Sequence, residues 1–205
     1  MKKGQISLEF LFIFVLFMVL LTFSIRNITF SSENSADMLR IQVSEEAKLF
    51  ANTVSNVISQ AYAQGPGAKT TEYFTFRYLN DEYFLTKAFD MDGNPQILIG
   101  YKNGTYVVIL DSANLSINLN ETDTEKKNYF WSQSLYARDL SDNSSIYSPN
   151  NTIETESGNY TGIFVNATDL PSTLKIVVEW NPDRNETWVF NSTSGELRIN
   201  INPGG

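Results

Sequence analysis

Glu9 stands out because it is a single carboxylate within the apolar run from Ile6 to Ile25. A carboxylate at membrane depth costs on the order of several kcal/mol unless it is paired or lifted to the interface. Near the start of a helix, the dipole favours a negative charge and the side chain can reach the headgroups. Glu9 is therefore either a group that meets a cationic partner or an interfacial carboxylate.

Other reactive chemistry is restricted by what the chain lacks. It contains no Cys and no His, which excludes a disulfide, a thiol nucleophile, a Ser-His-Asp relay and an imidazole metal ligand. The acidic segment Asp90–Asn94 resembles a calcium loop, but Pro95 stands where that loop needs glycine, so a turn is expected. Asp183 and Glu186 flank another expected turn. We expect no catalytic residue, metal site or cofactor, and no enzyme activity.

The composition narrows the class of protein. A chain of 205 residues with 42% apolar residues can bury a core, which suits one or two domains. The net charge of −8 offers no long basic stripe for a phosphate backbone, so nucleic acid is not an expected partner. Only 19% of residues are charged, and Asn, Ser and Thr crowd the C-terminal two thirds. This composition is typical of an exported surface.

Asn-x-Ser/Thr sequons are abundant and concentrate in expected loops and turns, which favours N-glycans on at least some of them. The preferred candidates are Asn114, Asn120, Asn143, Asn150, Asn159, Asn166, Asn185 and Asn191. Two others are disfavoured, because Asn27 lies beside the expected membrane and Asn103 lies in a tight turn.

The run from Ile6 to Ile25 predicts a membrane segment. Twenty helical residues span about 30 Å, the thickness of the hydrocarbon layer. Lys2 and Lys3 before the run favour an N-terminus inside the cell, with everything after Arg26 outside. No small-x-small cleavage site follows the run, so the helix is expected to remain on the mature protein.

The first residues carry a specific resemblance. The sequence Lys2-Lys3-Gly4-Gln5-Ile6-Ser7-Leu8-Glu9-Phe10 has a basic leader that ends in glycine, followed by Gln-x-Ser-x-Glu-Phe against an apolar stretch. It resembles the archaeal class III signal peptide of type IV pilin-like proteins, over about the first 25 residues.

The resemblance implies that a membrane-embedded prepilin peptidase cuts between Gly4 and Gln5, which removes residues 1–4 as a leader. In that family the glutamate at this place meets the freed N-terminal amine of a neighbouring subunit. Here Glu9 would meet the amine of Gln5, with Phe10 in the same assembly segment.

A long helix is expected from residue 5 to residue 64. Neither Gly nor Pro occurs from Gln5 to Gln64, and Gly65-Pro66-Gly67 then ends the element. Residues 5–26 form a hydrophobic half, and residues 36–64 form an amphipathic half. The amphipathic stripe consists of Leu39, Val43, Ala47, Phe50, Val54, Val57 and Ala61. The polar stretch from Asn27 to Ser35 predicts a weak point between the halves.

Residues 65–205 predict an antiparallel β-rich, sandwich-like head of seven to nine strands, so the fold class is α+β. Alternation begins at Tyr73, and Asn80-Asp81 is expected to turn the chain into a second strand through Phe89. Asn103-Gly104 predicts a two-residue hairpin. The later expected strands are 115–119, 162–167, 174–180, 187–191 and 196–201.

Most aromatic side chains of the head alternate as sheet cores do. The cluster Tyr129–Trp131 lies in a polar stretch from Glu121 to Tyr160 and is the best candidate for ligand contact, although core packing is the simpler interpretation.

These features predict a structural pilin subunit of a surface filament that serves adhesion. Its N-terminus would lie inside the cell and its precursor in the cytoplasmic membrane, and after cleavage it would assemble into a homo-oligomer through its N-terminal helices. The alternative is a membrane-anchored adhesion or ligand-binding domain that is processed and never polymerises. An archaellin is a weaker third option.

Overall fold

The computed structural model describes residues 3–29, 32–122, 125–137, 147–148, 151–155, 158–183 and 188–201. The chain divides into two compact units, Met1–Met38 and Leu39–Gly205. The second unit, called the head below, includes most of the amphipathic helix as well as the β-rich part. The chain is therefore α+β, as its sequence predicts.

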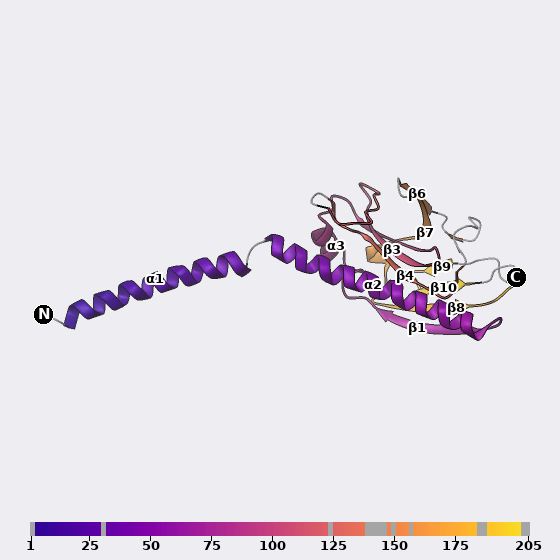
Figure 1. Ribbon diagram of the computed structural model, residues 1–205, viewed down its shortest axis with the longest axis horizontal. Coiled ribbons are helices and arrows are strands. Elements are labelled where there is room, and N and C mark those ends of the chain that lie inside the picture. Colours follow the sequence, from indigo (N-terminus) through magenta and orange to yellow (C-terminus); the bar gives the residue numbers. More distant parts are fainter. Residues whose placement is uncertain are drawn as a thin grey trace. The chain divides into compact units, whose positions relative to one another are not determined.

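Two helices occupy the N-terminal region. Helix α1 runs from Lys3 to Thr29, and helix α2 runs from Ser32 to Gln64 (Figure 1). The change from one to the other falls within the polar stretch that predicts a weak point. Helix α2 ends one residue before Gly65, whose φ of 89° is a left-handed value that glycine adopts without strain.

The β-rich part of the head consists of two five-stranded sheets. Their order is β1-β8-β10-β9-β5 in sheet A and β4-β3-β2-β7-β6 in sheet B. The strands are β1 (Lys69–Thr75), β2 (Pro95–Tyr101), β3 (Gly104–Asp111), β4 (Tyr129–Gln133), β5 (Tyr147–Ser148), β6 (Asn151–Thr155), β7 (Gly158–Asn166), β8 (Thr173–Glu179), β9 (Trp188–Asn191) and β10 (Glu196–Asn200).

The hairpin between β2 and β3 forms at the expected place. Asn103 has φ 53°, and a Cβ at Gly104 would approach the Ser132 carbonyl oxygen to 2.2 Å. Glycine is therefore needed at position 104 for its conformation and for its close backbone contact.

Not all strand pairs are antiparallel, which differs from the prediction. Strand β10 pairs parallel to β8, and β5 pairs parallel to β9. The chain passes from β8 to β9 and then returns with β10 between them. The hydrophobic pattern of a strand does not encode this return, because both orientations bury the same face.

One large core joins both sheets and α2. It contains the fully buried side chains of Phe50 on α2, Ile97 on sheet B and Ile176 on sheet A. Six of the seven predicted stripe residues, from Val43 to Ala61, are at most 2% exposed, and Leu39 packs partly buried against them. The prediction of an amphipathic helix that covers the head is confirmed.

The segment predicted as a strand through Phe89 is instead helix α3, Glu82–Phe89. Asp81 caps it by accepting hydrogen bonds from the backbone N–H of Tyr83 at 2.9 Å and of Phe84 at 3.4 Å. Asp90 ends it in a left-handed conformation with φ 57°. Leu85 and Ala88, three residues apart, are its buried face.

Residues 115–119 also differ from the prediction, since they form no strand. A second cluster covers the outer face of sheet B, and Ile117 and Leu119 belong to it. The Asn128 side chain holds this segment by donating to the Ser116 carbonyl at 2.8 Å and accepting from the Asn118 N–H at 2.7 Å. The apolar residues of 115–119 thus alternate because one side of this segment is buried, although the segment pairs with no strand.

The polar stretch from Glu121 to Tyr160 contains more structure than its sequence predicts. Strands β4, β5 and β6 lie within it, and β7 begins at Gly158, four residues before the expected start. These strands are short or rich in Asn, Thr and Ser, so they give little hydrophobic alternation.

Candidate functional site

The predicted processing and assembly residues all lie on α1. The bond between Gly4 and Gln5 falls in the first turn, since the helix begins at Lys3. Glu9 and Phe10 follow in the next turn, and both are exposed. The leader boundary stays a prediction.

Every large apolar side chain from Phe10 to Leu21 is exposed in the single chain, with exposed fractions between 39% and 70%. Phe23 is also 66% exposed. Moving one such side chain out of water contributes about 1.5–3 kcal/mol. Contiguous apolar surface of this size marks a region that contacts another apolar partner.

Within the described part of the chain, no helix is both long enough and apolar enough to cross a membrane. The predicted transmembrane span is therefore not confirmed.

A buried carboxylate fixes α2 to the head near β1. Glu46 is only 9% exposed, and its two oxygens accept hydrogen bonds from three consecutive backbone N–H groups, of Arg77 at 2.6 Å and of Tyr78 and Leu79 at 2.8 Å. These donors follow β1 directly and provide the charge-assisted hydrogen bonds that a buried carboxylate requires. Glu46 therefore anchors α2 to the connection between β1 and α3.

Polar side chains of α2 bind the opposite edge, at β4. The Ser55 hydroxyl donates to the Ser132 carbonyl at 2.8 Å and accepts from the Thr105 N–H at 3.0 Å. The Ser59 hydroxyl accepts from the Leu135 N–H at 3.0 Å, and Lys48 donates to the Trp131 carbonyl. The unpaired backbone groups of an edge strand are thus satisfied by a helix, which protects the edge from pairing with another chain.

Helix α2 therefore lies between β1 and β4, each of which is one of the two edge strands of its sheet (Figure 1). None of Glu46, Ser55 and Ser59 was predicted to have a role. Ser55 and Ser59 lie four residues apart beside the apolar stripe, and this spacing is a signal that could have identified them.

The acidic segment Asp90–Asn94 is a turn, between α3 and β2. Asp111 organises it by accepting from the N–H groups of Asp92 and Gly93, both at 2.9 Å, and it also accepts from Ala113 at 2.8 Å. Its carboxylate thus acts as a structural cap for the backbone. Among the described residues, no group of three acidic, histidine or cysteine side chains is arranged to hold a metal ion.

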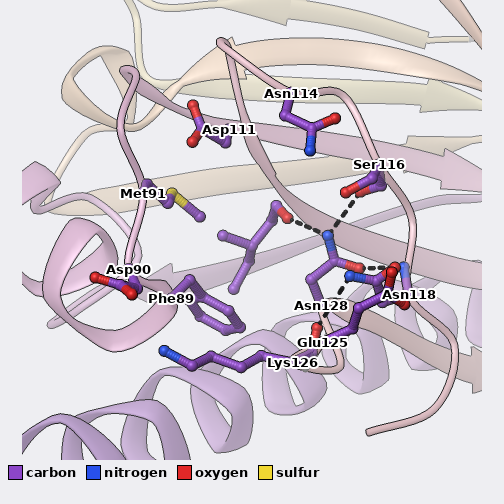
Figure 2. Close-up of a pocket in the computed structure, with 11 residues that line it drawn as sticks. Phe89, Asp90, Met91, Asp111, Asn114, Ser116, Asn118, Glu125, Lys126 and Asn128 are labelled. Carbon is purple, nitrogen blue, oxygen red and sulfur yellow. Dashed lines mark hydrogen bonds between the residues drawn. The ribbon is translucent and has the colours of Figure 1, made fainter. Parts of the chain in front are cut away.

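A polar pocket of about 280 Å³ lies beside this turn (Figure 2). Asp90, Asp111, Glu125 and Lys126 line it together with Asn128. The Asn128 amide is fully engaged by the carbonyls of Ile109 and Ser116 and by the Asn118 N–H. The side chain of Asn128 therefore has a structural role in this pocket.

The aromatic cluster Tyr129–Trp131 is divided between environments. Phe130 is 8% exposed and belongs to the main core, whereas Tyr129 packs beside Tyr106 on the outer face of sheet B. Only Trp131 among the three is exposed, at 38%. The three rings do not form one ligand-stacking surface, because alternation along β4 sends neighbours to opposite faces.

Two buried tyrosines have shifted ionisation. Burial raises the pKa of Tyr101, whose hydroxyl donates to the Tyr136 carbonyl at 2.6 Å, and burial also raises the pKa of Tyr129. Both hydroxyls stay protonated at neutral pH, so neither is suited to exchange protons there.

On the surface, the hydrogen bond from Lys175 is the main cause that lowers the pKa of Glu196, and Arg198 adds to it. These three residues form an ion-pair group across the neighbouring strands β8 and β10.

The sequons differ in their surroundings. Asn103, Asn114, Asn120, Asn159, Asn166 and Asn191 are exposed. The Asn166 side chain donates to Asp169 at 2.8 Å and accepts from Gln96 at 3.2 Å, and Asn191 accepts from the Ser194 N–H at 3.1 Å.

Four predicted positions cannot be placed. Asn143, Asn150, Asn185 and Glu186 lie outside the described residues. Asp183 is described, and its N–H donates to the Asn181 side chain at 3.0 Å. The Asn181 side chain therefore stabilises the start of the expected turn at this position.

Residues 2–28 match the family model for the class III signal peptide, which confirms the predicted leader motif. This match is consistent with a type IV pilin-like protein and covers the described part of α1 up to Ile28. No curated protein and no solved structure gives a significant match to the chain.

Proposed function

We propose that the chain is the precursor of a structural subunit of an archaeal type IV-like surface filament. A prepilin peptidase removes residues 1–4, and α1 then leaves the cytoplasmic membrane and packs among the α1 helices of other copies. A sandwich-like head, carrying N-glycans, is displayed on the cell surface for adhesion. The role is structural and requires neither a catalytic residue nor a cofactor.

The observation that carries the proposal is the exposure of α1. Twelve consecutive large apolar side chains, from Phe10 to Leu21, have no cover within the described chain. The class III signal peptide matched at residues 2–28 supplies a route by which this helix is retained after processing. Apolar packing between copies in an open, heterologous assembly would remove these side chains from water and lipid alike.

Glu9 supports the same proposal through its charge. Cleavage after Gly4 frees the amine of Gln5 only four residues before Glu9, on a helix that is otherwise apolar in this region. A carboxylate inside a packed apolar bundle needs a cationic partner, and the Gln5 amine of a neighbouring copy provides one. Phe10 would pack beside that pair.

N-terminal sequencing of the native protein tests processing. The expected first residue is Gln5. A chain that still begins with the leader, or one that begins near Asn27 after loss of the apolar helix, contradicts the proposal.

Filament formation is tested with a sheared surface fraction, in which electron microscopy should show filaments containing this chain. Glu9→Ala should reduce their yield at least several-fold while membrane recovery stays unchanged. Glu82→Ala, which removes an exposed carboxylate on α3, is the matched control. Recovery of the processed wild-type chain only from solubilised membranes would support the alternative of a non-polymerising adhesion domain.

A further inference from the structure

The exposed apolar side chains of the head gather around α2. Eight large apolar side chains are exposed among the described residues of the head. Six of them lie on α2, on the edge strands β1 and β4, or just after β4: Ile41, Leu49, Tyr62, Tyr73, Trp131 and Leu135. The surface formed by these six residues is called the α2 face below.

Two grooves run along α2 within this face. The groove between α2 and β4 has a volume of about 640 Å³ and is lined by Lys48, Lys127 and Trp131 among others. The groove between α2 and β1 has a volume of about 680 Å³ and includes Tyr73. Glu45 and Leu49 border both grooves and form the ridge that separates them, and Leu49 is 57% exposed.

Three of the exposed sequon asparagines lie on strands remote from the α2 face. None of the six described sequon positions of the head lies on α2, β1 or β4. Asn159 and Asn166 lie on β7, and Asn191 lies on β9. Each of these strands is the fourth from the edge that α2 binds, in sheet B and in sheet A respectively.

We propose that the α2 face is covered by the head of a second copy of this chain, while strands β7 and β9, which bear Asn159, Asn166 and Asn191, face solvent. The inference rests on the proposed filament function and adds the surface through which heads meet. Asn159, Asn166 and Asn191 thus lie on strands that carry none of the six side chains of the α2 face. Asn103 lies closer to the face, because the carbonyl of its neighbour Lys102 accepts from Trp131 at 3.3 Å.

A second copy fits this face in its charge and its symmetry. The groove beside β4 is lined by Lys48 and Lys127 and by a single carboxylate, Glu45, so its excess of positive charge complements a neighbouring copy, whose net charge is −8. In a helical filament all copies share one orientation, and each contact joins two different surfaces. The two flanks of α2, one with Trp131 and one with Tyr73, provide such a pair of unlike surfaces.

Cysteine labelling can test the inference, because the chain has no native thiol that would also react with the label. Leu49→Cys places a thiol on the ridge of the α2 face, and Ser192→Cys places one in the exposed turn after β9. A maleimide should react with Leu49→Cys roughly tenfold more slowly in intact filaments than in detergent-dissociated subunits, because the thiolate must be accessible. Ser192→Cys should react at nearly the same rate in both states.

Each outcome decides a different point. If wild-type chains form no filament, the proposed function and this inference fail together. If filaments form and Leu49→Cys reacts there as fast as in dissociated subunits, only the inference fails. Protection of Leu49→Cys in dissociated subunits as well would mean that the subunit's own chain covers the face, which also overturns the proposal.

A variant that assembles poorly needs a second measurement. Leu49→Lys should reduce filament yield several-fold, because it replaces an apolar side chain at the contact with an ammonium group that is costly to remove from water, whereas Ser192→Lys should not. Both side chains are exposed, so thermal unfolding of the dissociated subunits should be unchanged. Equal filament yields from the two variants would contradict the inference.

Discussion

Helices α1 and α2 are neighbours in sequence, yet the apolar side chains of α1 are exposed and those of the α2 stripe are buried. In α1 every described large apolar side chain is exposed, whereas the stripe of α2 from Val43 to Ala61 is at most 2% exposed. The difference lies in the pattern. Helix α1 is apolar on all sides, so no single face can satisfy it, and α2 is apolar along one stripe that the head can cover completely. A stripe directs a helix into its own fold, and an all-round apolar helix requires other molecules.

The strongest test of this comparison replaces one phenylalanine of each helix with alanine. Phe50→Ala should lower the free energy of unfolding of the head by about 3–5 kcal/mol. Phe50 is fully buried, and its ring centroid lies 5.1 Å from those of both Phe74 and Phe76. Phe14→Ala, on α1, should leave this free energy unchanged. Chemical denaturation in detergent, followed by tryptophan fluorescence, measures both. Equal effects would show that the two helices are not energetically distinct.

A second test concerns how a polar group secures α2. Glu46→Ala should destabilise the head by about 3 kcal/mol, because three backbone N–H groups lose a charged acceptor within a buried site. Glu46→Gln should cost less, since one oxygen can still accept. The neighbouring exposed residue provides the control, and Glu45→Ala should have little effect. If the two alanine variants unfold alike, the anchor has no energetic importance.

The smallest expected effect is at the edge of β4. Ser55→Ala should cost about 1–2 kcal/mol, because the Ser132 carbonyl and the Thr105 N–H lose their partner. Thr53→Ala is the control, since its hydroxyl bonds to Leu49 one turn earlier on the same helix. Hydrogen exchange should also show faster exchange at Thr105 in Ser55→Ala alone. Unchanged exchange at Thr105 would mean that the edge is protected by packing and not by Ser55.

Local patterns were sufficient to predict much of the fold. The stripe on α2, its end before Gly65-Pro66-Gly67 and the hairpin at Asn103-Gly104 each depend on residues close in sequence. The strands from Leu174 and from Glu196 could be predicted for the same reason, since a buried strand face repeats every second residue.

The errors share a different cause. Helix α3 was predicted as a strand, although Asp81 as a cap and the spacing of Leu85 and Ala88 favoured a helix. Strands β5 and β6 have too few apolar residues to show a period, and the parallel pair of β8 and β10 depends on the path of the chain between them. Glu46 could not be recognised as an anchor because its donors lie more than thirty residues away.

The predicted site residues divide in the same way. The leader motif is local, so residues 2–28 could be identified from their sequence. The α2 face could not be predicted, because it combines residues of α2, β1 and β4 that only the two sheets bring together.

The placement of α2 also has a mechanical consequence. In the proposed filament, flow would pull on the head and α2 would carry the load, since α2 is held along its length by Glu46, Ser55 and Ser59 as well as by its buried stripe. Tension parallel to the helix axis would load these attachments together in shear, so that they do not break one after another. The head of the proposed filament would therefore resist drag without a disulfide, which a chain that has no cysteine cannot form.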